Sequence, residues 1–305
     1  MKIQILLAAY NGARYIETQL DSLIRQQHNA GDGYEILISD DGSTDGTAEI
    51  LTEYQERYPS MISVLPSSGK GSAMKNFLYL MECSDGDVIF FCDQDDYWLP
   101  DKVSRTVAAF DDMGIPELVF SDAYIADENL KIIEVNEKAL QTHFHGDLTL
   151  QKLLVQNYIM GCTMAVNRTL VDGALRDDYP GMEMHDWWLA IYAKSFGKII
   201  HVPEKLMKYR QHGDNEVGAK DLRSGRYIRS HLNVKELRRS CGNLIAQAAG
   251  FYDRYGKEMT PEVRRIFTEF TSLRDRNKLS RIYTQIHEGY LKSTTERVIG
   301  QLLYM

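Results

Sequence analysis

Short apolar runs alternate with amphipathic stretches along the first part of the chain. Runs with the length and continuous apolar character of buried strands occupy residues 3–9, 35–39, 62–65, 88–92 and 118–121. Between the first four runs, apolar side chains recur at helical spacing, at 16–24, 43–54 and 73–81. Strands that are apolar on both faces need helices on both sides, and this alternation requires parallel pairing with right-handed crossovers. The pattern therefore predicts an α/β fold with a mostly parallel, doubly wound sheet.

The pattern changes in the second half of the chain. Helical spacing appears in three further stretches, at 149–156, 168–175 and 185–195. After Ala219 no strand pattern remains, only helical periodicity. We expect a boundary near Gly218, which separates an α/β domain, 1–218, from an all-helical C-terminal region, 219–305.

Composition excludes several classes of protein. With 305 residues, 44% hydrophobic and 26% charged, the chain has enough apolar material for a large core and is unlike a disordered protein. No apolar run approaches the roughly 20 residues of a membrane span, and the run 3–9 is too short for a signal peptide. Paired or CxxC spacing is missing from the four cysteines, Cys83, Cys92, Cys162 and Cys241. We therefore expect free thiols and a cytoplasmic location.

The net charge of -8 is unevenly distributed. Residues 1–219 carry a net charge of -16, whereas residues 220–305 carry +8. An acidic main body opposes nucleic-acid binding, which requires positive charge to neutralise phosphates. The same body can bind a phosphorylated ligand if a metal ion supplies the positive charge.

Polar clusters follow the predicted strands directly. Asn11 and Gly12 follow the first strand, and Asp40–Thr47 follows the second. In an open parallel sheet, ligands bind beyond the carboxyl ends of the strands, so both clusters stand at the expected edge. A carboxylate there can accept the imide N–H of uracil or thymine. An Asx turn and a helix cap explain Asp40–Thr47 equally well.

The densest cluster is Asp93-Gln94-Asp95-Asp96, which follows the fourth strand. A second D-x-D pair, Asp85 and Asp87, precedes that strand and so belongs to the opposite end of the sheet. Three carboxylates close together repel one another unless a cation intervenes. Because oxygen ligands predominate, the cluster predicts Mg²⁺ or Mn²⁺ and leaves the choice between them open. The alternative is a solvated acidic turn.

Three motifs together resemble glycosyltransferase family 2. They are Ala8-Ala9-Tyr10-Asn11-Gly12, the stretch Asp40–Thr47 and the stretch Asp93–Trp98, in this order and at this spacing. The resemblance covers residues 1–218 approximately. It implies a GT-A fold, which is Rossmann-like, and inverting transfer from a nucleotide-diphospho-sugar. Four segments further resemble the bacterial rhamnosyltransferases of cell-wall and capsular polysaccharides, namely Cys92–Trp98, Gly161–Met164, His185–Trp188 and Tyr209–His212.

The resemblance also implies roles at the nucleotide end of a site. Asp41 matches the residue that meets the pyrimidine, and Ala9 and Tyr10 line that pocket. Asp93 matches the residue near the ribose. Asn76 matches an asparagine that recurs on the third helix of relatives.

The diphosphate end and the catalytic base follow from the same resemblance. Asp95 matches the ligand of a divalent metal between the two phosphates. Arg210 and His212 match a late segment that closes over the diphosphate, and His212 is a second candidate metal ligand. Asp186 matches the general base that withdraws the proton of an acceptor hydroxyl, a step that an unassisted hydroxyl performs poorly. Asp186 can equally serve as an N-cap of its helix.

Substrate identity stays open within this resemblance. The rhamnosyltransferase branch implies dTDP-rhamnose as donor and a lipid-linked polysaccharide as acceptor, whereas UDP-hexoses and UDP-N-acetylhexosamines are the alternatives. A sugar-phosphate nucleotidyltransferase is disfavoured, because the loop after its first strand is rich in glycine, arginine and lysine, unlike Tyr10–Arg14 here. A non-catalytic carbohydrate-binding protein is disfavoured by the presence of both Asp95 and Asp186.

The basic C-terminal region has two interpretations beyond a solvated helix face. Its first residues include seven basic side chains, Lys220, Arg223, Arg226, Arg229, Lys235, Arg238 and Arg239. They can bind anionic lipid headgroups and hold the protein at the cytoplasmic face of the membrane. The apolar positions of the later helices can instead form a homodimer interface.

Overall fold

The fold was analysed in a computed structural model, which describes residues 1–67, 69, 71–133, 147–176, 178–213 and 234–305. The chain forms two compact units. The first contains Met1–Val135, Ile159–Leu175 and Gly197–Asn215. The second contains Asn136–Tyr158, Arg176–Phe196 and Glu216–Met305. The boundary expected near Gly218 lies outside the described residues and stays a prediction.

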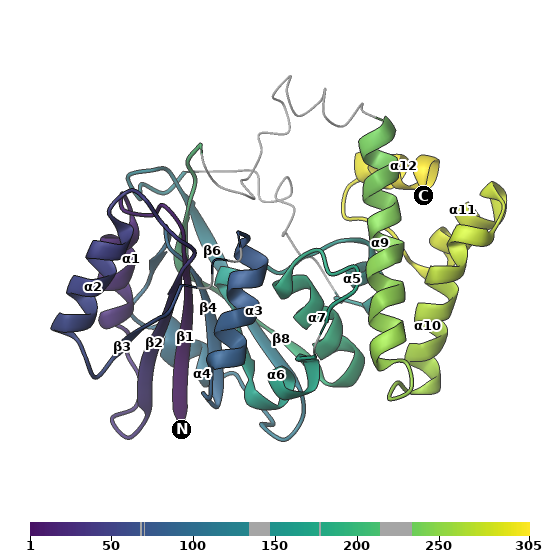
Figure 1. Cartoon of the computed structure of the whole chain (residues 1–305). Coiled ribbons are helices and arrows are strands. Elements are labelled where there is room, and N and C mark those ends of the chain that lie inside the picture. Colours follow the sequence, from purple (N-terminus) through teal and green to yellow (C-terminus); the bar gives the residue numbers. More distant parts are fainter. Residues whose placement is uncertain (68, 70, 134–146, 177, 214–233) are drawn as a thin grey trace. The chain divides into compact units, whose positions relative to one another are not determined.

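The first unit is built on an eight-stranded sheet with the order β3-β2-β1-β4-β7-β6-β8-β5 (Figure 1). The strands are β1 (Lys2–Ala9), β2 (Gly33–Asp40), β3 (Ile62–Leu65), β4 (Val88–Asp93), β5 (Tyr97–Trp98), β6 (Glu117–Ala126), β7 (Met164–Asn167) and β8 (Lys198–Arg210). β1 to β4 pair in parallel, as do β6 and β8, whereas β7 runs antiparallel to β4 and β6. The prediction of a mostly parallel α/β sheet is therefore confirmed.

Helices cover this sheet, and all of the described ones except the helix at Lys102–Val107 lie where the amphipathic spacing predicts them. They are α1 (Ile16–Ile24), α2 (Thr47–Arg57), α3 (Ala73–Cys83), α4 (Lys102–Val107) and α6 (Arg168–Ala174). Leu20 and Leu23 of α1 are fully buried, as are Phe90 and Phe91 of β4. Burial of apolar side chains from both the strands and the helices provides the main stabilisation of this layered arrangement.

Three strands are not predicted by the pattern of apolar residues. β5 has two residues and β7 has four, so neither is long enough to give a periodicity. β8 contains Pro203 and several exposed charged side chains, which disguise a 13-residue strand. Its pairing with β6 shifts register at Ser121 and Asp122, an irregularity that accommodates the proline.

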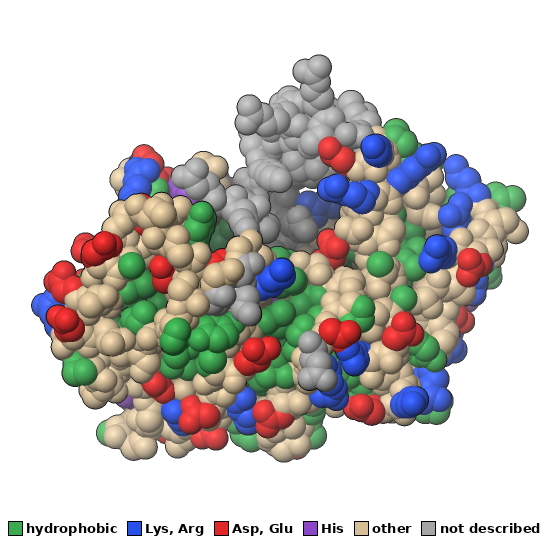
Figure 2. Space-filling model, viewed as in Figure 1, with side chains coloured by type: hydrophobic (Ala, Val, Ile, Leu, Met, Phe, Trp, Pro, Cys, Tyr) green, Lys and Arg blue, Asp and Glu red, His purple; other side chains and the backbone are tan. Residues whose placement is uncertain are grey.

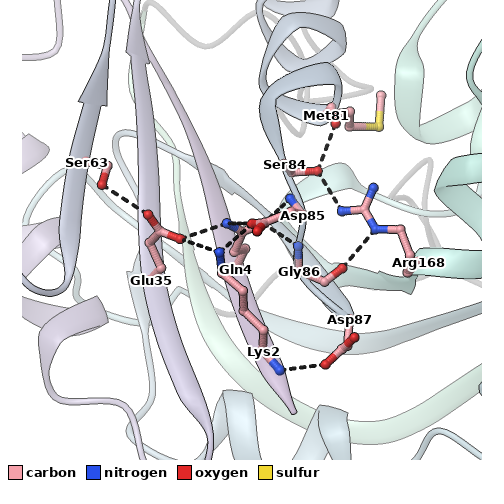
Figure 3. A network of polar contacts seen from close by, with 10 residues as sticks. All are labelled: Lys2, Gln4, Glu35, Ser63, Met81, Ser84, Asp85, Gly86, Asp87 and Arg168. Carbon is pink, nitrogen blue, oxygen red and sulfur yellow. Dashed lines mark hydrogen bonds and ion pairs between the residues drawn. The ribbon is translucent and has the colours of Figure 1, made fainter.

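A polar network closes the amino ends of the strands, opposite the edge where ligands are expected (Figure 3). The Gln4 side-chain amide donates to Glu35 Oε2 at 2.8 Å and to Asp85 Oδ1 at 2.8 Å. Arg168 Nε donates to the Gly86 carbonyl oxygen at 3.0 Å. Asp85 and its neighbour Asp87 thus belong to a structural network at the end of the sheet that the sequence assigns to them.

The second unit is helical throughout its described residues. Its α-helices are α5 (Leu150–Val155), α7 (His185–Phe196), α9 (Val234–Tyr255), α10 (Pro261–Ser272), α11 (Lys278–Glu288) and α12 (Thr295–Tyr304), with η3 (Leu273–Asp275) between α10 and α11. An aromatic core joins α7, α9 and α10, with Trp188 and Phe251 ring centroids 4.9 Å apart and Phe251 stacked on Phe267 at 5.2 Å. Thr260 accepts a hydrogen bond from Val263 N and Pro261 occupies the first turn, which explains where α10 begins. None of the described helices has the length and apolarity that crossing a bilayer requires.

Candidate active site

The carboxyl ends of β1, β2 and β4 lie next to one another. In the register of the sheet, Ala9 pairs with Asp40 and Ala8 pairs with Asp93. The polar clusters that follow these strands therefore meet at one edge of the first unit.

Hydrogen bonds tie the loop after β1 to the loop after β2. Asn11 N donates to Ser43 Oγ at 2.8 Å, and Thr44 N donates to Asn11 Oδ1 at 2.9 Å. Gly12 N donates to Thr47 Oγ1 at 2.8 Å. Much of the Asp40–Thr47 stretch thus builds a turn and starts α2, as the structural interpretation of the motif predicts.

The residues predicted at the pyrimidine lie together in this region. Ala9 is buried and its carbonyl oxygen accepts a hydrogen bond from Asp41 N at 2.9 Å, whereas Tyr10 is exposed. Asp41 Oδ2 accepts from Ser72 N at 3.0 Å. Asn76 is buried and its amide donates to the Ser39 carbonyl oxygen at 2.9 Å, which links α3 to β2. This contact gives Asn76 a structural task, and its role in binding stays a prediction.

Gln94 holds the loops after β1 and β4 together, a role that the sequence does not reveal. Its Oε1 accepts from Tyr10 N at 2.8 Å and its Nε2 donates to the Tyr10 carbonyl oxygen at 2.9 Å. A Cβ on Gly12 would lie 2.2 Å from Gln94 Oε1, so only glycine leaves room for this side chain. In the sequence, the glycine at position 12, next to a loop, is the one feature that points to the contact between Gly12 and Gln94.

Asp95, Arg210 and His212 meet at the same edge. His212 Nε2 lies 2.7 Å from Asp95 Oδ2, and Arg210 Nε donates to the Asp95 carbonyl oxygen at 2.6 Å. Arg210 N also donates to Asp96 Oδ1 at 3.0 Å. The last residue of β8 and the segment after it are thereby joined to the acidic loop, which places two groups that can carry positive charge beside its carboxylates.

The Tyr15 ring contacts both Arg210 and His212, a role that the sequence does not indicate. Its ring stacks on the His212 imidazole with centroids 4.7 Å apart, and the Arg210 guanidinium carbon lies 4.6 Å from the ring centroid. The Arg14 guanidinium carbon lies 5.1 Å away. The negative face of an aromatic ring attracts cations, so the Tyr15 ring stabilises the positive charge of the guanidinium groups that lie against it.

A buried layer of ionisable groups lies under the acidic loop. Burial, and then the neighbouring carboxylates of Asp95 and Asp93, raise the pKa of Asp96 well above its usual value. Burial lowers the pKa of Lys102 to about 8, and its ammonium lies 4.7 Å from the Trp98 ring centroid. Within the described part of the chain this ammonium has no hydrogen-bond partner. The Asp96 carboxyl favours the charged form of Lys102, but burial outweighs this effect.

Two groups of side chains are candidate ligand sets for a divalent metal. Among the described residues, Asp93, Asp96 and Cys162 place one possible ligand atom each within 4.8 Å of one another. Burial raises the pKa of the Cys162 thiol and of the Asp96 carboxyl, so neither readily becomes the anion that a metal needs.

Asp95 and His212 fit better. Their side chains keep 14% and 9% of their surface exposed, and both offer donors that Mn²⁺ accepts. Adjacent ligands of an octahedral ion at ~2.1 Å lie about 3 Å apart, close to the separation of these two atoms.

Asp186 differs from the other predicted site residues in that it belongs to the second unit. It lies in the first turn of α7, and its Oδ1 accepts from Trp187 N at 2.6 Å. The Trp187 indole donates to the Leu153 carbonyl oxygen at 2.6 Å, which fixes α7 against α5. Burial lowers the pKa of the preceding His185 to about 3, so this imidazole is neutral at physiological pH. The first unit thus holds eight of the nine predicted site residues, and the approach of Asp186 to them stays a prediction.

Comparison with known proteins identifies a family and a fold. Residues 4–172 match the family described as Glycosyl transferase family 2. The dTDP-rhamnosyl transferase RfbG of Shigella flexneri is 33% identical over 241 residues, which is 74% of this chain and 78% of that protein. An uncharacterized glycosyltransferase, alr2836, of a Nostoc species is 29% identical over 77% of this chain and 73% of its own length.

Solved structures show the same fold at low sequence identity. TarS of S. aureus, residues 1–349 in complex with UDP-GlcNAc, is 14% identical with a TM-score of 0.53, covering 99% of this chain and 90% of that one. The chain spans 55% of the length of a longer TarS structure. The mannosyltransferase PcManGT of Pyrobaculum calidifontis, in complex with GDP-Man and Mn²⁺, is 15% identical with a TM-score of 0.56, covering 99% and 79%. These neighbours are GT-A glycosyltransferases, so the expected GT-A fold and its C-terminal helical region are confirmed.

Proposed function

Because the chain belongs to glycosyl transferase family 2, we propose that it is an inverting rhamnosyltransferase that moves L-rhamnose from dTDP-rhamnose to a saccharide hydroxyl. The family makes the chain a transferase, and the similarity to RfbG supports the choice of donor. The observation that carries the proposal is the convergence of Asp95, Arg210 and His212 at the carboxyl edge of the sheet.

The loops after β1 and β2 bind the nucleoside in this proposal. Asp41 accepts the imide N–H of thymine, and Ala9 and Tyr10 line the base. Tyr10 is exposed at this edge, and its backbone is held by Gln94, so its ring can reach a planar base without moving the strand. Asp93, the last residue of β4, contacts the ribose.

Asp95 and His212 bind a divalent cation, Mg²⁺ or Mn²⁺, in this proposal. When bound, the cation acts as a Lewis acid that withdraws charge from the leaving diphosphate. Arg210 adds a guanidinium whose position is set by its hydrogen bonds to the Asp95 and Glu128 carbonyl oxygens. Fixed positive charge of this kind stabilises the negative charge that develops on the nucleoside diphosphate.

Asp186 is the proposed general base. Its carboxylate takes the proton of the acceptor hydroxyl while the hydroxyl oxygen bonds to the anomeric carbon and the bond to the diphosphate breaks. Attack opposite the leaving group inverts the anomeric configuration. The hydrogen bond that Asp186 accepts from Trp187 N holds the side chain at the start of α7.

The acceptor in this proposal is a lipid-linked polysaccharide of the cell wall or capsule, reached from the cytoplasmic face of the membrane. The basic stretch that would contact lipid lies mainly outside the described residues, which include only its last members, Lys235, Arg238 and Arg239 on α9. Homodimer formation through the later helices is the other partner hypothesis from the sequence.

A thermal-shift panel tests the donor. The purified protein is heated with dTDP-rhamnose, UDP-glucose or UDP-N-acetylglucosamine, each with and without Mn²⁺. A ligand at 100 times its Kd adds about 2.7 kcal/mol to the free energy of unfolding, enough to raise Tm by several degrees. We expect the largest rise with dTDP-rhamnose and Mn²⁺ together. A larger rise with a UDP-sugar supports the alternative donors, and no rise with any of them contradicts nucleotide-sugar binding.

A further inference from the structure

The last two helices of the second unit expose apolar side chains and bury polar ones. Leu279, Tyr283 and Ile286 of α11 are 80%, 66% and 54% exposed. Their spacing of four and three residues places them on one face of the helix. Ile299 and Leu303 of α12 are 54% and 52% exposed, four residues apart. These five residues are called the apolar face below.

The opposite sides of these helices make the contacts that hold the fold. Thr284 and Gln285 of α11 and Gln301 of α12 are buried. The Gln301 amide donates to Gln285 Oε1 at 3.0 Å and to the Tyr290 carbonyl oxygen at 2.6 Å. A surface helix normally buries its apolar side. The apolar face is therefore left over once the internal contacts are made, which marks it as a binding surface.

Basic residues outnumber acidic ones in the segment that carries the apolar face. Residues 273–305 contain six Lys and Arg against three Asp and Glu, a net charge of +3. Lys278 is exposed directly before Leu279, and Arg274 is exposed one turn earlier. Of the three acidic residues, Glu288 is engaged by Arg265 Nη1 at 3.1 Å, whereas Asp275 and Glu296 are exposed. In the view of Figure 2, Lys and Arg side chains gather over the C-terminal helices.

We infer that the apolar face of α11 and α12 docks on an anionic membrane surface. Leucine, isoleucine and tyrosine side chains enter the boundary between headgroups and acyl chains, while the exposed Arg274 and Lys278 bind lipid phosphates. A second copy of the chain would bring two segments of the same net positive charge together, and like charges oppose that association. The residues of this face are not those of the basic stretch 220–239 in the sequence, and the inference does not depend on the proposed transfer reaction.

Vesicle flotation tests the apolar component. The full chain is mixed with phosphatidylcholine vesicles with or without phosphatidylglycerol, and a triple variant, Leu279→Ser, Tyr283→Ser and Ile286→Ser, is compared with Met113→Ser, an exposed apolar position in the first unit. We expect the wild type and the Met113 variant to float only with the anionic vesicles. The triple variant should partition about tenfold more weakly, because most of the apolar anchor is gone. Flotation of the triple variant at the wild-type level would overturn the inference.

The charge component and the rival occupant are tested separately. Replacing Arg274 and Lys278 by Glu should weaken binding to anionic vesicles, whereas replacing the exposed Arg57 and Lys131 of the first unit by Glu should not. Equal binding of the wild type to neutral and anionic vesicles would contradict the role of charge. The molar mass in solution tests the rival occupant, a second copy of the chain. If the wild type is a dimer and the triple serine variant is a monomer, the apolar face is a dimer interface and the membrane inference is overturned. A melting temperature within a few degrees of wild type establishes that each variant is folded.

Discussion

His212 Nε2 lies 2.7 Å from Asp95 Oδ2, although 117 positions separate the two residues in the chain. β8 ends at Arg210, and its parallel pairing with β6 carries the following segment back to the carboxyl edge of the sheet. Because the same segment also supplies the Arg210 guanidinium, an imidazole and a guanidinium lie together at the acidic loop.

Replacing Asp95 by Asn should remove metal-dependent donor binding. The amide is a neutral and weaker ligand than the carboxylate, so we expect a loss of turnover of about 100-fold or more. Binding of Mn²⁺ with dTDP, followed by calorimetry, measures the effect without relying on activity. Asp85→Asn is the matched control, since this D-x-D member lies at the other end of the sheet in an exposed ion pair with Lys2. Equal metal binding by the Asp95 variant and the wild type would remove Asp95 as a ligand.

Replacing Asp186 by Asn should separate binding from chemistry. The amide oxygen can still accept the hydrogen bond from Trp187 N, so α7 keeps its start, but it cannot take a proton. Loss of a general base lowers turnover by about 10²–10⁴-fold, and we expect unchanged affinity for dTDP. Turnover near the wild-type level would exclude Asp186 as the base. Glu183→Gln, three residues earlier in the same unit, is the control.

Tyr15 should act through its ring rather than its hydroxyl. The hydroxyl is buried without a hydrogen-bond partner among the described residues, so Tyr15→Phe should keep both stability and donor affinity. Tyr15→Leu removes the surface that carries the Arg210 guanidinium and the His212 imidazole, and we expect KM for the donor to rise about tenfold. Ring-current shifts of the His212 protons, measured by NMR, report the stacking directly. Identical behaviour of the Phe and Leu variants would show that the stacking has no role in binding.

Gly12 and Gln94 should be energetically coupled. In Gly12→Ala the new Cβ collides with the Gln94 side chain and displaces it from both Tyr10 backbone contacts. We expect a loss of about 1–3 kcal/mol in the free energy of unfolding and weaker donor binding. In a Gln94→Ala background the Gly12 substitution should cost much less, and a double-mutant cycle measures the difference. Additive costs would contradict the proposed displacement.

His185 should make the protein sensitive to mild acid. Burial lowers its pKa to about 3 from 6.5, so between these values the unfolded chain binds a proton that the folded chain excludes. The contribution of His185 to the free energy of unfolding is therefore full above pH 6.5. It falls as the pH drops below this value, by up to about 1.4 kcal/mol per pH unit. Urea unfolding of His185→Gln between pH 7 and pH 4 should show a shallower decline than the wild type. His287→Gln, at an exposed histidine, should follow the wild type, and equal slopes for all three proteins would contradict the assignment.

Most helices and most parallel strands could be predicted because their signals are local, whereas the six-residue α4 was not predicted. β1 and β4 are apolar on both faces, and α1 repeats Leu20 and Leu23 at the spacing of one buried side. The acidic loop could be located because it directly follows β4. β8 could not be predicted, because Pro203 and exposed charged side chains interrupt its apolar pattern and its formation depends on pairing with β6.

The sequence by itself determined the α/β class, the strand that each polar cluster follows, and the separation of the two D-x-D pairs to opposite ends of the sheet. Those properties depend on chain direction and periodicity, which are written in consecutive residues. Only the tertiary structure decided that His212 lies against Asp95, that the Arg210 guanidinium packs on the Tyr15 ring, and that Gln94 hydrogen-bonds the Tyr10 backbone. It also decided which side of α11 stays exposed. Each of these is a contact between distant segments, fixed by how the layers pack rather than by any local pattern.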